Sequence, residues 1–111
     1  MKDARLSAFT HLQFLILSVL LHAPEEPGRA VRDTLATFGV RRTAPAFYQL
    51  MARLERAGLV EGWYEQITVG DQAVTERRYR ITKAGAARWE ETRHFYDRTV
   101  PAALRRRWSN G

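Results

Sequence analysis

Arginine is concentrated in the ten-residue stretch ERRYRITKAG at 76–85 and supplies nearly all of the positive charge of the chain. Among the 18 basic residues only Lys2 and Lys83 are lysines, and the net charge is +6. A guanidinium group presents a planar fork of donors that suits phosphate groups and guanine edges. The composition therefore indicates an anionic partner, either nucleic acid or an acidic membrane surface. Because genome composition also explains a preference for arginine over lysine, the interpretation depends on where the arginines lie.

Residues that commonly perform catalysis or hold metals are sparse and poorly spaced. His11, His22 and His94 do not have the spacing of a metal-ligand set, and there is no cysteine. His94 follows Glu90 by four residues, which is more typical of a contact on a helix surface than of a metal site. The sequence has no P-loop, no glycine-rich nucleotide loop and no convincing Ser–His–Asp set. We therefore expect no enzymatic activity, no metal and no cofactor.

The length and the apolar pattern indicate a small cytoplasmic domain. A chain of 111 residues suits one compact domain, and a hydrophobic content of 45% is ordinary for a folded protein. The absence of cysteine fits a reducing cytoplasm. The longest apolar run, FLILSVLL at 14–21, is shorter than the roughly 20 residues that span a bilayer, and it lacks the features of a signal peptide. No membrane partner is expected.

The first predicted helix covers about 8–21, with Ser7 as its cap. It is apolar nearly all round, so it needs cover on two sides, and a partner chain is a candidate for the second side. The stretch APEEPG at 23–28 breaks the helix with two prolines and a glycine. We expect Glu25 and Glu26 to lie in a solvated turn there.

Two further helices are predicted at about 29–38 and 44–57. Thr43 is a typical cap, Pro45 suits the first turn because its missing N–H does no harm there, and Gly58 is well placed to end the helix. The expected inward residues are Ala30, Val31, Leu35 and Phe38 in the earlier helix, and Phe47, Leu50, Met51 and Leu54 in the later one. The expected solvent face of the later helix consists of Ala46, Gln49, Arg53 and Arg56.

The pattern then changes to β-branched and aromatic residues at 59–69 and 74–82, separated by the turn residues GDQA. This pattern is typical of a two-stranded antiparallel hairpin. A last helix is predicted from Lys83 to about Asp97, and Pro101 is expected to break it before a short terminal helix.

Alternation along the second strand places Tyr79 and Ile81 on one face and Arg78 and Arg80 on the other. The apolar pair can hold the strand on the core while the two arginines face phosphates. Thr82 is the expected cap of the last helix.

The order helix, helix, helix, hairpin, helix predicts a winged helix-turn-helix, which is mainly α with a small β-hairpin. In this architecture the third helix enters the major groove of DNA and the hairpin lies beside it as a wing. We expect residues 1–82 to form the winged helix-turn-helix DNA-binding domain and residues 83–111 to form a C-terminal helical dimerisation segment.

Two stretches, FYQLMARLERAGLVEGW and ERRYRITKAG, resemble the PadR family of bacterial transcriptional regulators over roughly residues 10–96. The family pattern combines a tyrosine in the recognition helix, the motif LxRLExxGL, a tryptophan in the first wing strand and the motif RxYxLTxxG. The matching positions are Tyr48, Leu54, Glu55, Gly58, Leu59, Trp63, Arg78, Arg80, Thr82 and Gly85. The resemblance implies a dimeric regulator that binds double-stranded DNA, usually as a repressor.

Two stretches depart from the family pattern. The HGY run at the start of the second helix is replaced by EPGRA, in which only Gly28 is retained. A GTLYP-like run is replaced by PAFYQ at 45–49, so Ala46 lacks the hydroxyl of the family threonine. The family's operator half-site therefore does not transfer to this chain.

The residues themselves predict the DNA contacts. Positive groups and free N–H groups at the start of the third helix favour a phosphate, and Gln49 and Arg53, one turn apart, can read adenine and guanine edges. Arg53 has the alternative of pairing within its own helix. The wing arginines are expected to contact the DNA backbone, with Arg77 nearer the free end of the hairpin. The predicted set is Arg41, Arg42, Thr43, Ala46, Gln49, Arg53, Arg77, Arg78 and Arg80.

The resemblance implies a homodimer formed by the first and last helices, with a cavity that binds a small aromatic compound. The candidate residues are Phe9, Leu12, Ile16, Trp89, Phe95 and Tyr96. The alternative is that the aromatic residues of the last helix pack only on the first helix of their own chain.

Two other functions remain open on the sequence. A winged helix can be a protein-interaction adaptor, with RRRW at 105–108 contacting an acidic partner, and the missing HGY run is compatible with an effector-less viral or plasmid DNA-binding protein.

Overall fold

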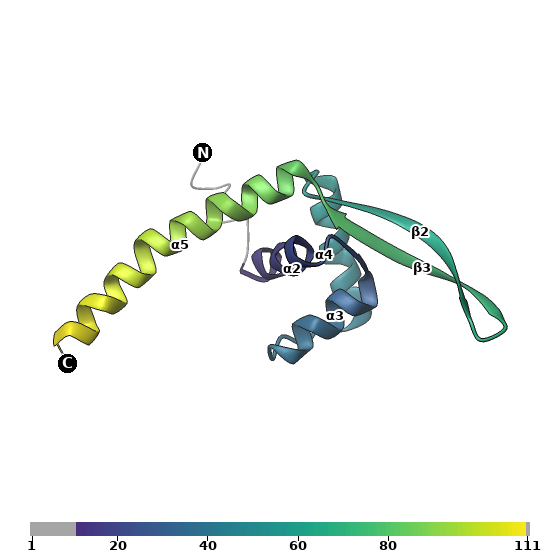
Figure 1. The fold of residues 1–111 in the computed structure, drawn as a ribbon, viewed down its shortest axis with the longest axis horizontal. Helices are drawn as coiled ribbons and strands as arrows, with labels where there is room; N and C mark the ends of the chain where they lie inside the picture. Colours follow the sequence, from purple (N-terminus) through teal and green to yellow (C-terminus); the bar gives the residue numbers. More distant parts are fainter. Residues whose placement is uncertain (1–10, 111) are drawn as a thin grey trace.

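The computed structural model describes residues 11–110, which form four helices and a three-stranded antiparallel sheet (Figure 1). The elements are α2 (His11–His22), β1 (Glu25–Pro27), α3 (Gly28–Thr37), α4 (Ala44–Arg56), β2 (Val60–Val69), β3 (Gln72–Ile81) and α5 (Lys83–Asn110). The predicted fold class, mainly α with a small β part, is confirmed. The predictions for Ser7 and Phe9 fall outside the described residues.

The core lies between α2, α3, α4 and the base of the hairpin. Its buried members are Ile16, Leu17, Leu20, Val31, Leu35, Phe47, Met51, Leu54, Leu59, Val60 and Tyr79. The predicted inward faces of α3 and α4 are confirmed except at Phe38, whose side chain is 70% exposed. That prediction is wrong because α3 ends at Thr37 and the backbone leaves the helical path at Phe38, where ψ is 11°.

The expected signals at both ends of α4 operate as predicted. Thr43 has an extended backbone, and its Oγ1 accepts a hydrogen bond from the N–H of Ala46 at 3.3 Å. After the last turn, Gly58 has a φ of 76°, a conformation that glycine adopts without strain. The recognition-helix candidate is therefore bounded by local sequence chemistry.

The hairpin of β2 and β3 gains a third strand that the sequence pattern did not predict. The sheet order is β1-β3-β2, and Glu26 of β1 pairs with Tyr79 of β3. The prediction of a solvated turn at Glu25 and Glu26 is wrong, because this segment finds its backbone partners on β3; Glu25 remains exposed and Glu26 is half-buried.

Thr82 joins the sheet to α5. Its hydroxyl accepts a hydrogen bond from the N–H of Gly85 at 3.0 Å and donates one to the carbonyl of Gly58 at 2.6 Å. Its own N–H donates to the carbonyl of Leu59 at 3.1 Å. The predicted cap is confirmed, and it also fixes the start of α5 against the end of α4.

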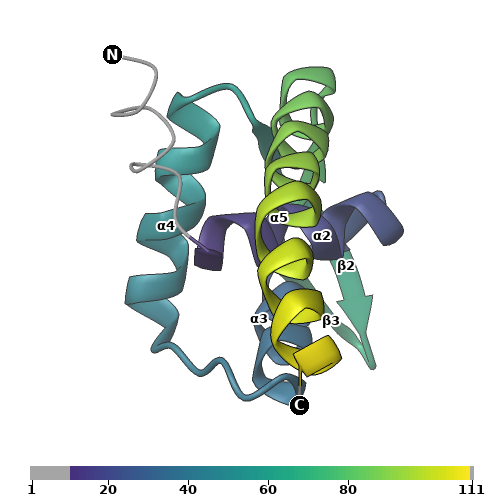
Figure 2. The same ribbon diagram turned by 90° about the vertical axis from the view of Figure 1, so that its left-hand side faces the viewer.

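The helix α5 continues through Pro101 to Asn110, so the predicted break is wrong. A proline inside a helix removes one N–H donor, and the remaining hydrogen bonds on both sides carry the helix past it. Figure 1 shows α5 and the hairpin projecting to opposite sides of the helical body, and in Figure 2 α2 runs crosswise behind α5. Within the described range, no helix has the combination of length and apolar character that crossing a membrane requires.

Candidate nucleic-acid interface

Three arginines surround the start of α4. Arg41 and Arg42 are exposed on the connection before Thr43, and Arg32 of α3 donates from Nε to the backbone carbonyl of Arg42 at 2.9 Å. Together with Asp33 they border a hollow of about 460 Å³. Guanidinium groups at the positive end of a helix dipole suit a phosphate, although Pro45 has no N–H and that of Ala46 donates to Thr43. Sequence reasoning missed Arg32, although its place on the exposed side of the predicted second helix could have indicated it.

The solvent face of α4 is polar as predicted. Gln49, Arg53 and Arg56 are exposed, and Ala46 is half-buried. Arg53 makes no ion pair within its own helix, so the alternative considered for it is not realised. Gln49 and Arg53 lie one turn apart and make no side-chain hydrogen bond or ion pair with any described residue, so they can meet the edges of neighbouring base pairs.

Each wing arginine forms an ion pair with a carboxylate. The pairs, each with a closest N–O distance of 2.8 Å, are Arg77–Glu55, Arg78–Glu76 and Arg80–Glu61. Only the Arg80–Glu61 pair has both side chains more than half exposed, and the hydrogen bond from Arg80 to Glu61 is the largest cause of the raised pKa of Arg80. The wing therefore presents less free positive charge than the sequence alone suggests.

Arg77 turns away from the free end of the hairpin and towards α4. Its guanidinium carbon lies 4.6 Å from the ring centre of Tyr64 and 5.5 Å from that of Tyr79. Burial raises the pKa of Tyr79, while the hydrogen bond with Arg77 acts in the opposite direction. The phenol thus stays neutral beside the charged Arg77–Glu55 pair at physiological pH.

The far half of the wing, residues 66–75, has no basic side chain, and Asp71 is its only charged residue. Val69 is 59% exposed and Val74 is 40% exposed. This part of the hairpin can touch a partner by shape and apolar contact but offers no cation to a phosphate.

Tyr48, the tyrosine of the family pattern, packs within the domain. Its ring lies 5.1 Å from that of Phe47 and 6.5 Å from that of Tyr79. A Cβ atom on Gly28 would lie 2.7 Å from the Tyr48 ring. The retained glycine therefore makes room for the retained tyrosine.

Two aromatic residues of α5, Trp89 and Tyr96, pack on α2 of the same chain. The rings of Phe14 and Trp89 are stacked at 5.8 Å with planes 4° apart, and Tyr96 meets Phe14 edge-on at 5.8 Å. Trp89 Nε1 donates to Ser18 Oγ at 2.6 Å. The alternative reading, in which these aromatics pack on the first helix, is realised for Trp89 and Tyr96.

The other candidate dimerisation residues differ in accessibility. Ile16 is fully buried in the core of its own chain, so its side chain is not accessible to a partner. Leu12 is half-buried, and Phe95 is 42% exposed. Phe9 falls outside the described residues.

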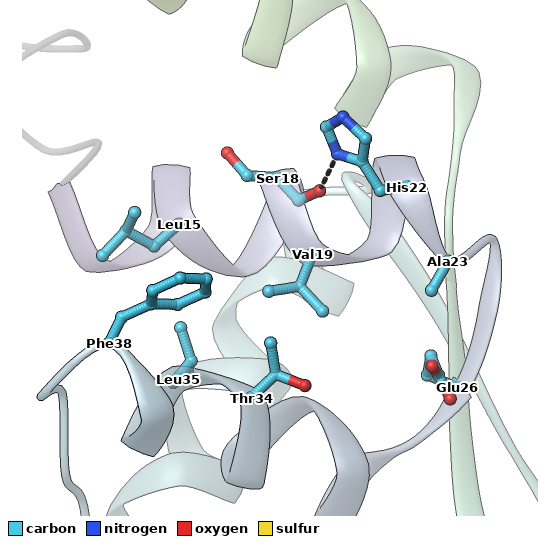
Figure 3. Close-up of a pocket in the computed structure, with 9 residues that line it drawn as sticks. All are labelled: Leu15, Ser18, Val19, His22, Ala23, Glu26, Thr34, Leu35 and Phe38. Atoms are coloured by element: carbon cyan, nitrogen blue, oxygen red, sulfur yellow. Dashed lines mark hydrogen bonds between the residues drawn. The ribbon is translucent and has the colours of Figure 1, made fainter.

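A second hollow of about 460 Å³ lies between α2 and α3 (Figure 3). Its lining is mostly apolar and consists of Leu15, Ser18, Val19, His22, Ala23, Glu26, Thr34, Leu35 and Phe38. The exposed ring of Phe38 faces Leu15 across it (Figure 3). Part of the surface of α2 that the core does not cover therefore lines this hollow.

No group of three or more histidine, aspartate or glutamate side chains in residues 11–99 is arranged to hold a metal ion. The polar groups that are brought together are instead the arginines at the start of α4 and the ion pairs of the wing. The arrangement suits the binding of a polyanion.

Three helices followed by an antiparallel hairpin, with a polar third helix, define a winged-helix protein. No protein-family model matches the sequence, and no curated protein matches it. Among solved structures, the chain is similar to a PadR-like transcription factor from Bacteroides fragilis, with a TM-score of 0.70 and 15% identity over 95% of this chain and 98% of that one.

Two further structures share the fold. A PadR-family transcriptional regulator from Eggerthella lenta has a TM-score of 0.62 and 24% identity over 94% of this chain and 93% of that one. Bacillus subtilis PadR in complex with operator DNA has a TM-score of 0.59 and 15% identity over 75% of this chain and 46% of that one. The protein has a PadR-like winged-helix fold, and the first two of these similar proteins are a transcription factor and a regulator rather than enzymes.

Proposed function

We propose that this protein is a sequence-specific, PadR-like regulator of transcription that binds double-stranded DNA as a homodimer and represses. The observation that supports DNA reading most is the exposed face of α4, where Gln49 and Arg53 lie one turn apart. The major groove admits an α-helix, and these side chains match adenine and guanine edges. The likeness to operator-bound Bacillus subtilis PadR agrees with this role. Such a regulator would act in the cytoplasm.

Phosphate contacts then come from both sides of α4. Arg41, Arg42 and Arg32 surround its start, where the positive end of the helix dipole adds to their charge. Arg80, the most exposed of the wing arginines, lies at the base of the wing. These contacts would set the register of α4 in the groove without reading sequence.

We extend the proposal to a dimer built by α2 and by the C-terminal segment 83–111, which follows the winged-helix domain 1–82. The projection of α5 beyond the helical body (Figure 1), the exposure of Phe95 and the apolar hollow beside α2 support this. A two-fold dimer would read two half-sites about one helical turn apart and would occlude a promoter.

A small aromatic effector is the last part of the proposal. Phe14, Trp89 and Tyr96 already form an aromatic cluster on the surface shared by α2 and α5. A planar compound bound there, between two protomers, would change the spacing of the two α4 helices and release the DNA.

Arg53→Ala is expected to change which DNA sequence is preferred. A lost bidentate contact to guanine removes about 1–3 kcal/mol of discrimination at one base position. The measurement is the selection of duplexes from a random pool by the purified wild type and variant at one stated salt concentration. Relaxed preference at one position of each half-site is the expected result.

The matched control is Arg56→Ala, which removes the same charge from the last turn of the same helix. It should leave the selected sequence unchanged. If wild-type protein selects no sequence at all, the reading role of α4 is wrong and the adaptor function is favoured.

Phe95→Glu is expected to weaken the proposed dimer at least about tenfold, because a carboxylate in an apolar contact must be desolvated. Sedimentation velocity over a range of concentrations measures this. The fold should persist, since the ring is 42% exposed in the single chain. His94→Glu, at the neighbouring exposed position, is the control. A wild-type protein that is monomeric at all concentrations would refute the dimer.

A further inference from the structure

The wing is tied to two different helices by two carboxylates. Glu55 of α4 accepts from Arg77 of β3 at 2.8 Å. Glu76 of β3 accepts from Arg78 at 2.8 Å and from Arg29, at the start of α3, at 3.2 Å. Because consecutive strand residues point to opposite faces, the two ties lie on opposite faces of β3. Together they restrain the hairpin against both the recognition helix and the helix before it.

Burial makes the tie to α4 stronger than an ordinary surface ion pair. In the tie to α3, the side chain of Glu76 is only 8% exposed but that of Arg29 is 67% exposed. Arg77 and Glu55 are 24% and 27% exposed. Salt screens partly buried pairs much less than exposed ones, and removing one partner leaves a charge without compensation.

The sequence around the first tie leaves space for it. Gly62 of β2 lies opposite Tyr79 in the sheet. A Cβ atom on Gly62 would lie 2.8 Å from Arg77 Nη2 and 2.9 Å from both Glu55 Oε1 and Tyr79 Cε1. The guanidinium is also held over the ring of Tyr64. Arg77 is thus held by Glu55, Tyr64 and Tyr79 of its own chain.

Glu76, the carboxylate of the second tie, is also held within β3 by Arg78. Arg78 sits in the middle strand, between Pro27 of β1 and Trp63 of β2 in the register of the sheet. Beyond the two ties, residues 66–75 offer no cation. The wing thus has a fixed base and an outer half without a basic side chain.

We propose that Arg77 is a positioning residue, which sets the angle between the wing and α4 through Glu55 and does not bind phosphate. This rests on the proposed function, in which α4 and the wing meet the same duplex. The ties hold the wing at a fixed angle before DNA binds, which lowers the ordering cost of association. The role differs from the backbone contact that the sequence pattern suggested for Arg77.

The test compares Arg77→Gln, Glu55→Gln, the double variant, and the charge-swapped pair Glu55→Arg with Arg77→Glu. If Arg77 is a positioning residue, each single variant weakens binding to the selected duplex by about tenfold, and the double variant is no weaker, since each change breaks the same pair. The dependence of log affinity on log salt keeps its slope. The charge-swapped protein recovers most of the lost affinity.

A phosphate contact gives the opposite pattern. Arg77→Gln would then make the salt slope shallower by about 0.9, Glu55→Gln would leave binding unchanged or stronger, and the charge swap would not rescue. Each of these three results would overturn the proposal. The same comparison with Arg29→Gln and Glu76→Gln tests the second tie, which joins the wing to α3.

A measurement without DNA separates this proposal from the proposed function. The chain has no cysteine, so Thr68→Cys on β2 and Arg56→Cys on α4 can carry a pair of spin labels. The distribution of distances between the labels should broaden in Glu55→Gln and narrow again in the charge-swapped pair. An unchanged distribution would overturn the positioning role even if DNA binding is confirmed. A broadened one would support the role even if duplex binding shows no sequence preference.

Discussion

Gly85→Ala is expected to lower the free energy of unfolding by about 3 kcal/mol or more, although the change replaces a poor helix former by the best one. A Cβ atom on Gly85 would overlap the carbonyl oxygen of Leu59 and crowd Ile81. That carbonyl cannot move freely, because it accepts the hydrogen bond of the Thr82 N–H. Relief of the overlap would have to shift α5 away from the start of β2.

Denaturant unfolding followed by circular dichroism measures this change, and a fall of the melting temperature by about 10–15 °C should accompany it. The control is Ala87→Gly, two residues along the same helix and exposed, which should cost only about 1 kcal/mol through helix propensity. A Gly85→Ala variant as stable as the wild type would show that the contact with Leu59 is not rigid.

The junction between β3 and α5 gives a physical reason for the spacing of Thr82 and Gly85 in TKAG. The threonine hydroxyl joins the end of α4 to the start of α5 by donating to Gly58 and accepting from Gly85. The glycine, three residues on, lets α5 pass close to the backbone of Leu59. The two residues therefore work together, and the loss of either would loosen the start of α5 against the end of α4.

The recognition-helix candidate could be predicted because its determinants are local. The Thr43 cap, Pro45 in the first turn and Gly58 after the last turn act within a few residues of the backbone that they shape. Apolar residues at helical spacing then decided the buried face. The solvent face, with Gln49 and Arg53, followed from the same spacing.

Other features could not be predicted because distant residues create them. β1 has three residues, too few for any alternation to be visible, and it exists only through its pairing with β3. The carboxylate that pairs with Arg77 stands 22 residues earlier, on another element. Counting arginines in the second strand therefore overestimated the free charge of the wing. The position of Arg32 beside Arg42 likewise depends on how α3 packs.

Arg41→Ala combined with Arg42→Ala is expected to weaken binding to every duplex by about 60-fold at 0.1 M salt. Each phosphate contact releases counterions and contributes about 0.9 to the slope of log affinity against log salt, which corresponds to about eightfold per contact at this concentration. Both side chains are exposed beside the start of α4 and form no ion pair with any described residue. Their removal should therefore cost binding without costing stability.

Titration of a labelled duplex between 50 and 300 mM salt measures both the affinity and the slope, which should become shallower by about 1.8. The preferred sequence should stay the same, because phosphate contacts do not read bases. The control is Arg93→Ala with Arg98→Ala, which removes the same net charge from α5. If both double variants weaken binding equally, overall charge attracts the DNA and the start of α4 is not a phosphate site. If only the first does, the helix N-terminus and its two arginines act together as the anchor from which α4 enters the groove.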